Sequence, residues 1–286
     1  MIKKYFFITS CFLYLVICSM LIVSKAWTEE AGRVEITYLS GETKVLLKGC
    51  QDYVAVEEGM MLESGDKVKT GSAAALELSF NEDDSNLVRL GSDTSAEISL
   101  SGDEKLFLTE GEVFASVARL SSGAAFEIRT PTAISGARGT DWVTRVSQEE
   151  TDVEAIDQSP YVRHFEKEGV ISRQEILIRP GEMTTVKKFQ RPQAARTIMN
   201  ARLESLKAVK KILQLNIIEA QIKRKQRPAF DRSQFLQKIK GQINDLRLEK
   251  PGAVGLDSGK IKPMGKPWER KGKDIKEWPG RKFLPW

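Results

Sequence analysis

Histidine and cysteine, on which many catalytic and metal sites depend, are scarce in this sequence. The chain of 286 residues holds one histidine and three cysteines, and Cys11 and Cys18 lie in an apolar stretch near the N-terminus. Cys50 is then alone in the rest of the chain, which excludes a disulfide within that part and a multi-cysteine metal site. The single histidine, His164, argues against a multi-histidine metal site or a histidine-paired nucleophile, and we expect it on the surface of a strand.

Patterns typical of ion or phosphate binding are also missing. The acidic run at residues 81–86 has neither the turn glycine nor the downstream glutamate of a helix-loop-helix calcium site, so we interpret it as a solvated hairpin turn. The glycines within residues 136–140 are not followed by the lysine of a phosphate-binding loop. We therefore predict no enzymatic activity, cofactor or metal. A hydrolase with paired carboxylates stays an alternative, because sequence does not give the separation of carboxylates in space.

One long uncharged run stands near the N-terminus. Residues 5–23 carry no charge and follow Lys3 and Lys4, so this segment is expected to enter a membrane during synthesis. Ser24 and Ala26 put small residues where a signal peptidase accepts them. We expect cleavage after Ala26 and a protein that works in the periplasm or otherwise outside the cytoplasm. Because the run is longer than most cleaved signals, an inner-membrane anchor with the bulk of the chain facing the periplasm is the alternative.

The net charge of +5 conceals a division of the chain into an acidic and a basic part. Residues 1–190 hold 20 Lys and Arg against 30 Asp and Glu, a balance of −10, whereas residues 191–286 hold 24 against 9, a balance of +15. The boundary therefore falls near Arg191. We predict four parts: a signal or anchor at 1–26, a β-domain at 33–188, a helical hairpin at 192–249 and a tail at 250–286.

The acidic part reads as a series of short strands. Apolar and polar residues alternate in segments such as residues 76–80, 126–129 and 176–179, and Gly, Asn or Asp interrupts the pattern about every ten residues. No segment there offers a helix with an apolar stripe, so the domain should be mainly β. Two architectures fit, a solenoid-like stack of short strands and a β-sandwich.

The basic part changes to a helical period. Apolar residues recur at three- and four-residue spacing from Met199 to Ala220 and again from Phe235 to Leu246. Asp231 has the sequence pattern of an N-cap for the second helix, and these two helices would form the hairpin. Beyond Lys250, Lys, Gly and Pro dominate, and we expect a disordered basic tail with a few tryptophans.

Three sequence pieces within the β-domain, taken together, resemble the FecR domain. Residues 126–142 read FEIRTPTAISGARGTDW, which is similar to the family's F-x-I-x-T-P-x-A … R-G-T-x-F signature. Residues 62–71 read LESGDKVKTG and resemble its L-x-x-G-D-x-V-x-T-G piece, and residues 106–113 resemble L-x-L-x-x-G-x-V. Trp142 stands where the family usually has Phe. The motif residues are Gly65, Asp66, Thr70, Gly71, Thr130, Pro131, Arg138, Gly139, Thr140 and Trp142.

The resemblance implies a solenoid-like domain that acts by protein contact and has no catalytic residues. FecR regulators proper carry a cytoplasmic anti-sigma segment before their membrane helix, and with four residues ahead of the apolar run here we expect that segment to be absent. The motif residues also have a structural reading. Thr130 and Pro131 would end one strand, Gly136 and Gly139 would form a corner, and Arg138 would pin that corner to carbonyls or a carboxylate.

Clustered cations in the basic part favour two further interpretations beside a solvated face. They would contact an anionic cell-wall polymer or membrane surface, or they would dock on the acidic domain of the same chain. Nucleic acid is not expected, because the protein is exported. We therefore predict a binding module whose partner is an envelope protein or an anionic polymer, and as the alternative a membrane-anchored signalling component with a separate cytoplasmic partner. The candidate polymer contacts are Lys210, Lys211, Lys223, Arg224, Lys225, Lys271, Lys273 and Lys276.

Overall fold

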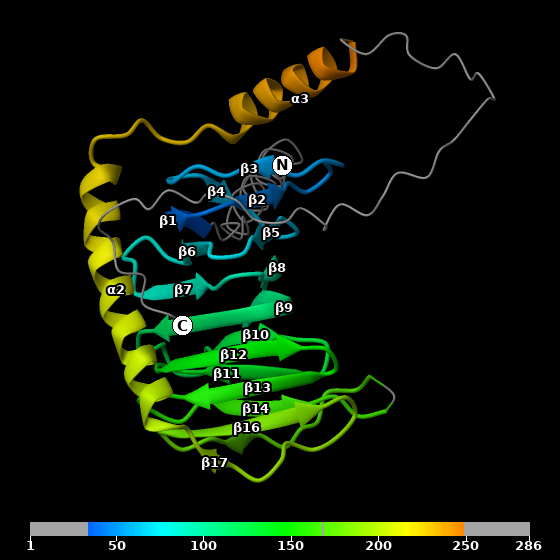
Figure 1. Ribbon diagram of the computed structural model, residues 1–286, viewed down its shortest axis with the longest axis vertical. Coiled ribbons are helices and arrows are strands. Elements are labelled where there is room, and N and C mark those ends of the chain that lie inside the picture. Colours follow the sequence, from blue (N-terminus) through cyan, green and yellow to red (C-terminus); the bar gives the residue numbers. More distant parts are fainter. Residues whose placement is uncertain (1–33, 168, 249–286) are drawn as a thin grey trace, which may run out of the picture. The chain divides into compact units, whose positions relative to one another are not determined.

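The computed structural model describes residues 34–167 and 169–248 (Figure 1). Seventeen strands run from Val34 to Thr197 and are followed by two helices, which confirms the mainly β class and the two C-terminal helices. The predicted signal or anchor and the predicted tail, with Lys271, Lys273 and Lys276, lie outside these residues. Within the described part of the chain, no helix is long and apolar enough to cross a membrane.

The strands pair in two series that share the long strand β9. The first sheet has the order β4 (Met61–Leu62), β1 (Val34–Ser40), β6 (Ala75–Ser79), β7 (Asn86–Leu90), β9 (Glu104–Val117), β12 (Asp141–Ser147), β13 (Glu150–Ala155), β16 (Glu182–Lys187) and β17 (Arg196–Thr197). The second has the order β3 (Val54–Ala55), β2 (Thr43–Leu46), β5 (Lys67–Thr70), β8 (Ser95–Ser101), β9, β10 (Phe126–Arg129), β11 (Ala133–Ala137), β14 (Tyr161–His164) and β15 (Ile176–Leu177).

Pairing is antiparallel throughout these two sheets except between β9 and β10, which run parallel. The first half of β9 pairs with β8 and β10, and its second half pairs with β7 and β12, so this one strand joins both sheets. The pattern fits both architectures expected from the sequence, a stack of short strands and a sandwich.

Apolar side chains from the two sheets meet in a common core. Trp142 of β12 lies edge-on to Phe126 of β10, with ring centroids 6.1 Å apart, and Phe126 in turn meets Phe80 at 5.0 Å. Both Trp142 and Phe126 are fully buried, and aromatic rings of this size contribute much of the apolar area that a core removes from water. The aromatic position of the 126–142 motif is therefore a packing position.

Helix α2 (Asn200–Arg224) lies across the first sheet, as Figure 1 shows. Most of its predicted apolar stripe is buried, since Leu206, Leu213 and Ile217 pack with Phe114 and Val143 of the sheet in one cluster. Met199, the first residue of the predicted stripe, lies just ahead of the helix and is 78% exposed. Burying three such side chains stabilises the docked helix by several kcal/mol, at about 1.5–3 kcal/mol for each. The amphipathic pattern thus attaches α2 to the β-domain.

Helix α3 (Arg232–Leu248) belongs to a second unit, which begins at Asp231. Its first turn is capped as the sequence predicted, because the Asp231 carboxylate accepts hydrogen bonds from the backbone N–H of Ser233 and Gln234 at 2.9 and 3.1 Å.

Candidate functional site

The aspartate of the LESGDKVKTG piece organises a turn from the inside. Asp66 is fully buried, and its carboxylate accepts hydrogen bonds from the backbone N–H groups of Lys48 at 2.7 Å and Glu63 at 2.9 Å. Gly65 before it has φ +94°, which a residue with a side chain rarely adopts. Asp66 and Gly65 therefore fix the chain path into β5.

The motif threonines bridge backbone groups in the same manner. The Thr70 hydroxyl donates to the carbonyl of Gly91 at 2.6 Å and accepts from the N–H of Thr94 at 2.9 Å. The Thr130 hydroxyl lies 2.8 Å from that of Thr151 on β13, so it links the second sheet to the first. These buried hydroxyls are satisfied by internal partners, which makes them structural residues.

The R-G-T corner differs in part from its predicted geometry. Gly136 lies inside β11 and not in the corner, and a Cβ there would come within 2.6 Å of the Tyr161 hydroxyl. Gly139 does form the corner, and its φ is +142°. A Cβ added to Gly139 would lie only 2.7 Å from the Cα of Arg119, so the corner has no room for a side chain. The Arg138 side chain is exposed and forms no staple with any residue that the structure describes, although its carbonyl accepts a hydrogen bond from the N–H of Leu120.

Behind Gly136, a buried polar group connects β10 and β14. The Tyr161 hydroxyl donates to the Glu127 carboxylate at 2.5 Å, and Arg163 pairs with the same carboxylate. Burial, followed by the hydrogen bond to Glu127, raises the pKa of Tyr161 above its ordinary value. The phenol is thus held as a hydrogen-bond donor.

A line of ion pairs attaches α2 to carboxylates of the first sheet. Arg202 near its start binds Glu112 at 2.7 Å and Glu154 at 3.0 Å, and Lys210 binds Asp141 at 2.5 Å and Asp157 at 2.6 Å. The basic helix thus docks on the acidic domain, the intramolecular alternative that the charge division raised.

The C-terminal end of α2 covers the turn between β6 and β7. Arg224 pairs with Asp84 at 2.9 Å and with Glu35 at 2.7 Å, and Gln221 donates to Asp84 at 3.0 Å. Although burial raises the pKa of Asp84, hydrogen bonds led by that from Arg224 outweigh it and hold the pKa below its ordinary value. The turn is a hairpin as predicted, but Asp84 is buried under the helix and is not solvated.

The predicted polymer contacts divide into three groups. Lys210, Lys223 and Arg224 are engaged in ion pairs with carboxylates of the β-domain. Lys211 and Lys225 form no ion pair with any residue that the structure describes. The three tail lysines lie outside the described residues, and a polymer contact by any of the eight stays a prediction.

A second apolar stripe runs along the outer face of α2. Leu213 is 1% exposed, whereas Leu215, two positions and about 200° further around the helix, is 66% exposed. Ile212, Ile218 and Ile222 continue the outward stripe at helical spacing and are each about half exposed. An apolar row of this length on a docked helix is a feature typical of protein contact surfaces.

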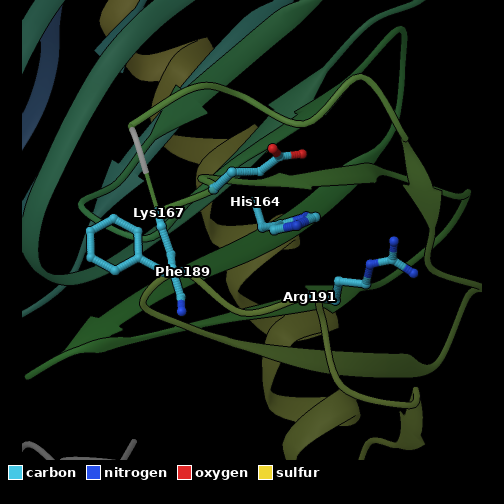
Figure 2. Close-up of a pocket in the computed structure, with 5 residues that line it drawn as sticks. His164, Lys167, Phe189 and Arg191 are labelled. Carbon is cyan, nitrogen blue, oxygen red and sulfur yellow. The ribbon is translucent and has the colours of Figure 1, made fainter.

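A depression lies between the ends of β14 and β16, which belong to different sheets (Figure 2). It has a volume of about 540 Å³ and is lined by His164, Glu166, Lys167, Phe189 and Arg191. In Figure 2, His164 stands at the centre, with Lys167 and Phe189 on one side and Arg191 on the other.

His164 is buried, contrary to the surface position expected from the sequence. It points to the same face of β14 as the fully buried Val162, because side chains two positions apart share a face of a strand. It is 7% exposed, and its Nδ1 atom has no hydrogen-bond partner among the residues described. Among the lining residues, the sequence singled out only His164, as the one histidine, and Arg191, as the boundary between the acidic and basic parts. The described part of the chain has no group of three or more His, Cys, Asp or Glu side chains that could hold a metal ion.

Comparisons with known proteins match part of the β-domain to a family. Residues 66–158 match the model of the family described as "FecR protein". No curated protein matches the chain. Two crystal structures of a "putative anti-sigma factor" from Parabacteroides distasonis ATCC 8503, at 2.50 and 1.65 Å, are similar with 17% identity and a TM-score of 0.36. Each similarity covers 46% of this chain and 59% of that protein, less than two thirds of its length. The family match includes the R-G-T corner and most of the other two pieces, and residues 66–158 are a FecR domain.

Proposed function

We propose that this FecR-domain protein is a non-catalytic regulatory module that works outside the cytoplasm by binding another protein. The observation that carries the proposal is the outward apolar stripe of α2, which consists of Ile212, Leu215, Ile218 and Ile222. The stripe lies on a helix whose opposite face is fixed to the FecR domain.

Rigid attachment makes this stripe suitable for recognition. Ion pairs from Arg202 to Arg224 hold α2 along its length, so a partner would meet a surface that is already ordered. Binding then costs less conformational entropy than the ordering of a flexible segment. We propose that the stripe binds an apolar surface of a different protein, because FecR domains are expected to act by protein contact.

The acidic domain makes an anionic polymer a less favoured partner. Lys210 and Arg224, which the sequence offered as candidate polymer contacts, form ion pairs with carboxylates of the same molecule. A polymer would have to compete with those carboxylates, whereas an apolar partner surface would not. The location outside the cytoplasm rests on the export pattern of residues 1–26, and the membrane-anchored signalling component remains the alternative for that segment.

Site-specific photocross-linking tests the contact. A benzophenone amino acid at position 218 in the full chain, made in its native cells, should give one discrete adduct with an exported protein. The same group at Leu177, which is 64% exposed on β15, is the matched control and should not give that adduct. Replacing Leu215 and Ile222 by Glu should abolish the adduct, because buried charges at an apolar contact are strongly unfavourable.

Three results would count against the proposal. An adduct of twice the mass of the chain would mean that the occupant is a second copy. Cross-links confined to a single chain would mean that the stripe is covered internally. An adduct that survives the two Glu substitutions would mean that the stripe does not form the contact.

A further inference from the structure

We propose that the partner meets the stripe on α2 with an amphipathic helix, which carries an apolar row of about three turns and an acidic residue near each end of that row. The inference rests on the proposed protein contact and adds the shape and the charge of the surface that makes it. Two features of α2 carry it: the spacing of the residues in the stripe and a pair of lysines that bracket them.

The spacing of residues on α2 suits a second helix, because both of its faces repeat every seven residues. On the face that packs on the sheet, the buried residues at this interval are Leu206, Leu213 and Ala220. On the outer face, Leu215 and Ile222 are exposed at the same interval, with Ile218 between them. Alternating spacings of three and four are the pattern with which one helix packs its side chains between those of another. The stripe therefore matches a helix laid along α2.

A lysine stands at each end of the stripe. Lys211 comes before it and Lys225 after it, and the two are about 21 Å apart along the helix axis. On an ideal helix they point within about 40° and about 80° of Leu215, so they share its side of the helix. Both lysines are exposed, and neither forms an ion pair with any residue that the structure describes.

Other charges beside the stripe are neutralised within the helix. Glu219 pairs with Lys223 at 2.7 Å, and Glu204 pairs with Lys207 at 2.9 Å. The two bracketing lysines therefore set the charge of this surface, and an acidic residue near each end of the partner's apolar row complements them. Because residues 1–190 carry a balance of −10, the rest of the β-domain repels an acidic helix. These charges direct such a helix to the stripe.

An anionic membrane is the other surface that exposed isoleucines and lysines would suit. The acidic domain behind α2 counts against it, because docking would bring that domain toward charges of its own sign. A helix with acidic residues at two positions only is not repelled in this way over its whole length. The charges of the molecule thus favour a helix over a membrane.

Two designed peptides test the charge pattern. Each is an amphipathic helix of about three heptads with the same row of leucines, and one carries glutamates and the other lysines at both ends. Fluorescence anisotropy with the full-length chain gives their dissociation constants. The glutamate peptide should bind in the micromolar range, because a stripe of four side chains is smaller than a stable interface. The lysine peptide should bind at least about tenfold more weakly.

Matched variants of the chain locate the contact. Lys211→Glu together with Lys225→Glu should weaken binding of the glutamate peptide by about tenfold or more and strengthen binding of the lysine peptide. Lys67→Glu together with Lys69→Glu makes the same charge change on two exposed lysines of β5 and should leave both affinities unchanged.

An uncharged change tests the apolar row itself. Leu215→Ser together with Ile222→Ser should abolish binding of the glutamate peptide, because the row loses its apolar side chains while the lysines remain. Unfolding curves of each variant separate a loss of binding from a loss of structure.

The cross-link from position 218 separates this inference from the proposed function. Absence of any adduct would overturn the protein contact and the helical partner together. An adduct that forms at the same yield in the Lys211→Glu, Lys225→Glu variant would leave the protein contact in place and overturn the acidic helix. Equal affinities of the two peptides would also overturn the acidic helix alone.

Vesicles of phosphatidylcholine and phosphatidylglycerol in equal amounts test the membrane. Binding of the full chain to them that is lost with Leu215→Ser and Ile222→Ser would assign the stripe to a lipid surface and overturn both proposals. Vesicle binding that these substitutions leave unchanged would belong to another part of the chain and is the result expected.

Discussion

At the scale of single residues, the polar and aromatic side chains of the FecR motifs hold the fold in shape. Asp66 caps a turn, Thr130 joins two sheets and Trp142 fills the core, with its Nε1 donating to the Ser135 hydroxyl at 3.3 Å. Groups that elsewhere serve catalysis are here satisfied by internal hydrogen bonds, and a satisfied buried group contributes to one defined structure. The sequence predicted these structural roles in outline but not their partners.

Gly139 allows a direct test of the R-G-T corner. Gly139→Ala should lower the free energy of unfolding by about 3 kcal/mol, because the new Cβ combines an unfavourable φ with a contact of 2.7 Å to the Arg119 backbone. Gly123→Ala is the control: φ is +89° there, but nothing lies within 4 Å of the added carbon, so a loss of about 1 kcal/mol is expected. Urea denaturation measures both, and equal losses would show that the close approach at Gly139 has no effect.

Side-chain direction at single positions was the least predictable feature. Period-two alternation identified the strands, but it does not say which face of β14 points inward, and His164 was assigned to the wrong one. Gly136 was predicted at a corner, since sequence does not reveal that Tyr161 approaches it from a strand 25 residues further along. Both errors concern contacts between segments that are distant in sequence.

At the scale of elements, the sequence predicted that α2 is an amphipathic helix, but it did not predict which residues α2 docks against. The spacing of Leu206, Leu213 and Ile217 predicted an amphipathic helix, and all three are buried. The charge division raised docking on the acidic domain as one alternative, yet the partners of Lys210 and Arg224 come from strands and turns 50 to 190 residues away. The apolar residues of the outward stripe, at positions 212, 215, 218 and 222, also recur at helical spacing. The sequence did not reveal them as a separate stripe, because the buried stripe of the same helix has the same spacing.

The Asp84 contact predicts how this docking depends on pH. Asp84→Asn should lower the free energy of unfolding at pH 7 by about 2 kcal/mol, because Arg224 and Gln221 lose a buried charged acceptor. The pKa of Asp84 is below its ordinary value of 3.8, so its stabilisation is present above that value and is lost as the pH falls through the folded-state pKa. The difference between wild type and variant should therefore shrink toward zero under acid conditions.

Glu82→Gln supplies the control for this measurement. Glu82 lies in the same turn and is exposed, so the same change of charge should alter stability by less than about 0.5 kcal/mol at any pH. Denaturant titrations of the three proteins at several pH values give the comparison. A wild-type advantage over Asp84→Asn that persists unchanged in acid would contradict the assignment of the effect to the Asp84 carboxylate.

At the scale of the whole molecule, the outer face of α2 is an apolar surface of the kind that contacts proteins. The place of the protein relative to the membrane decides which partners it meets, and we expect residues 1–26 to set that place.

The mature N-terminus is therefore the last prediction. Small residues at Ser24 and Ala26 fit a signal peptidase, so the protein recovered from its native cells should begin at Trp27, as mass spectrometry of intact protein and N-terminal peptides would show. Replacing Ala26 by a bulky residue should block cleavage and leave the protein bound to the membrane, since 19 uncharged residues suffice to hold it there. Recovery of unaltered protein with its first residues intact and firmly membrane-bound would favour the anchored signalling component, in which the α2 stripe would meet its partner beside the inner membrane.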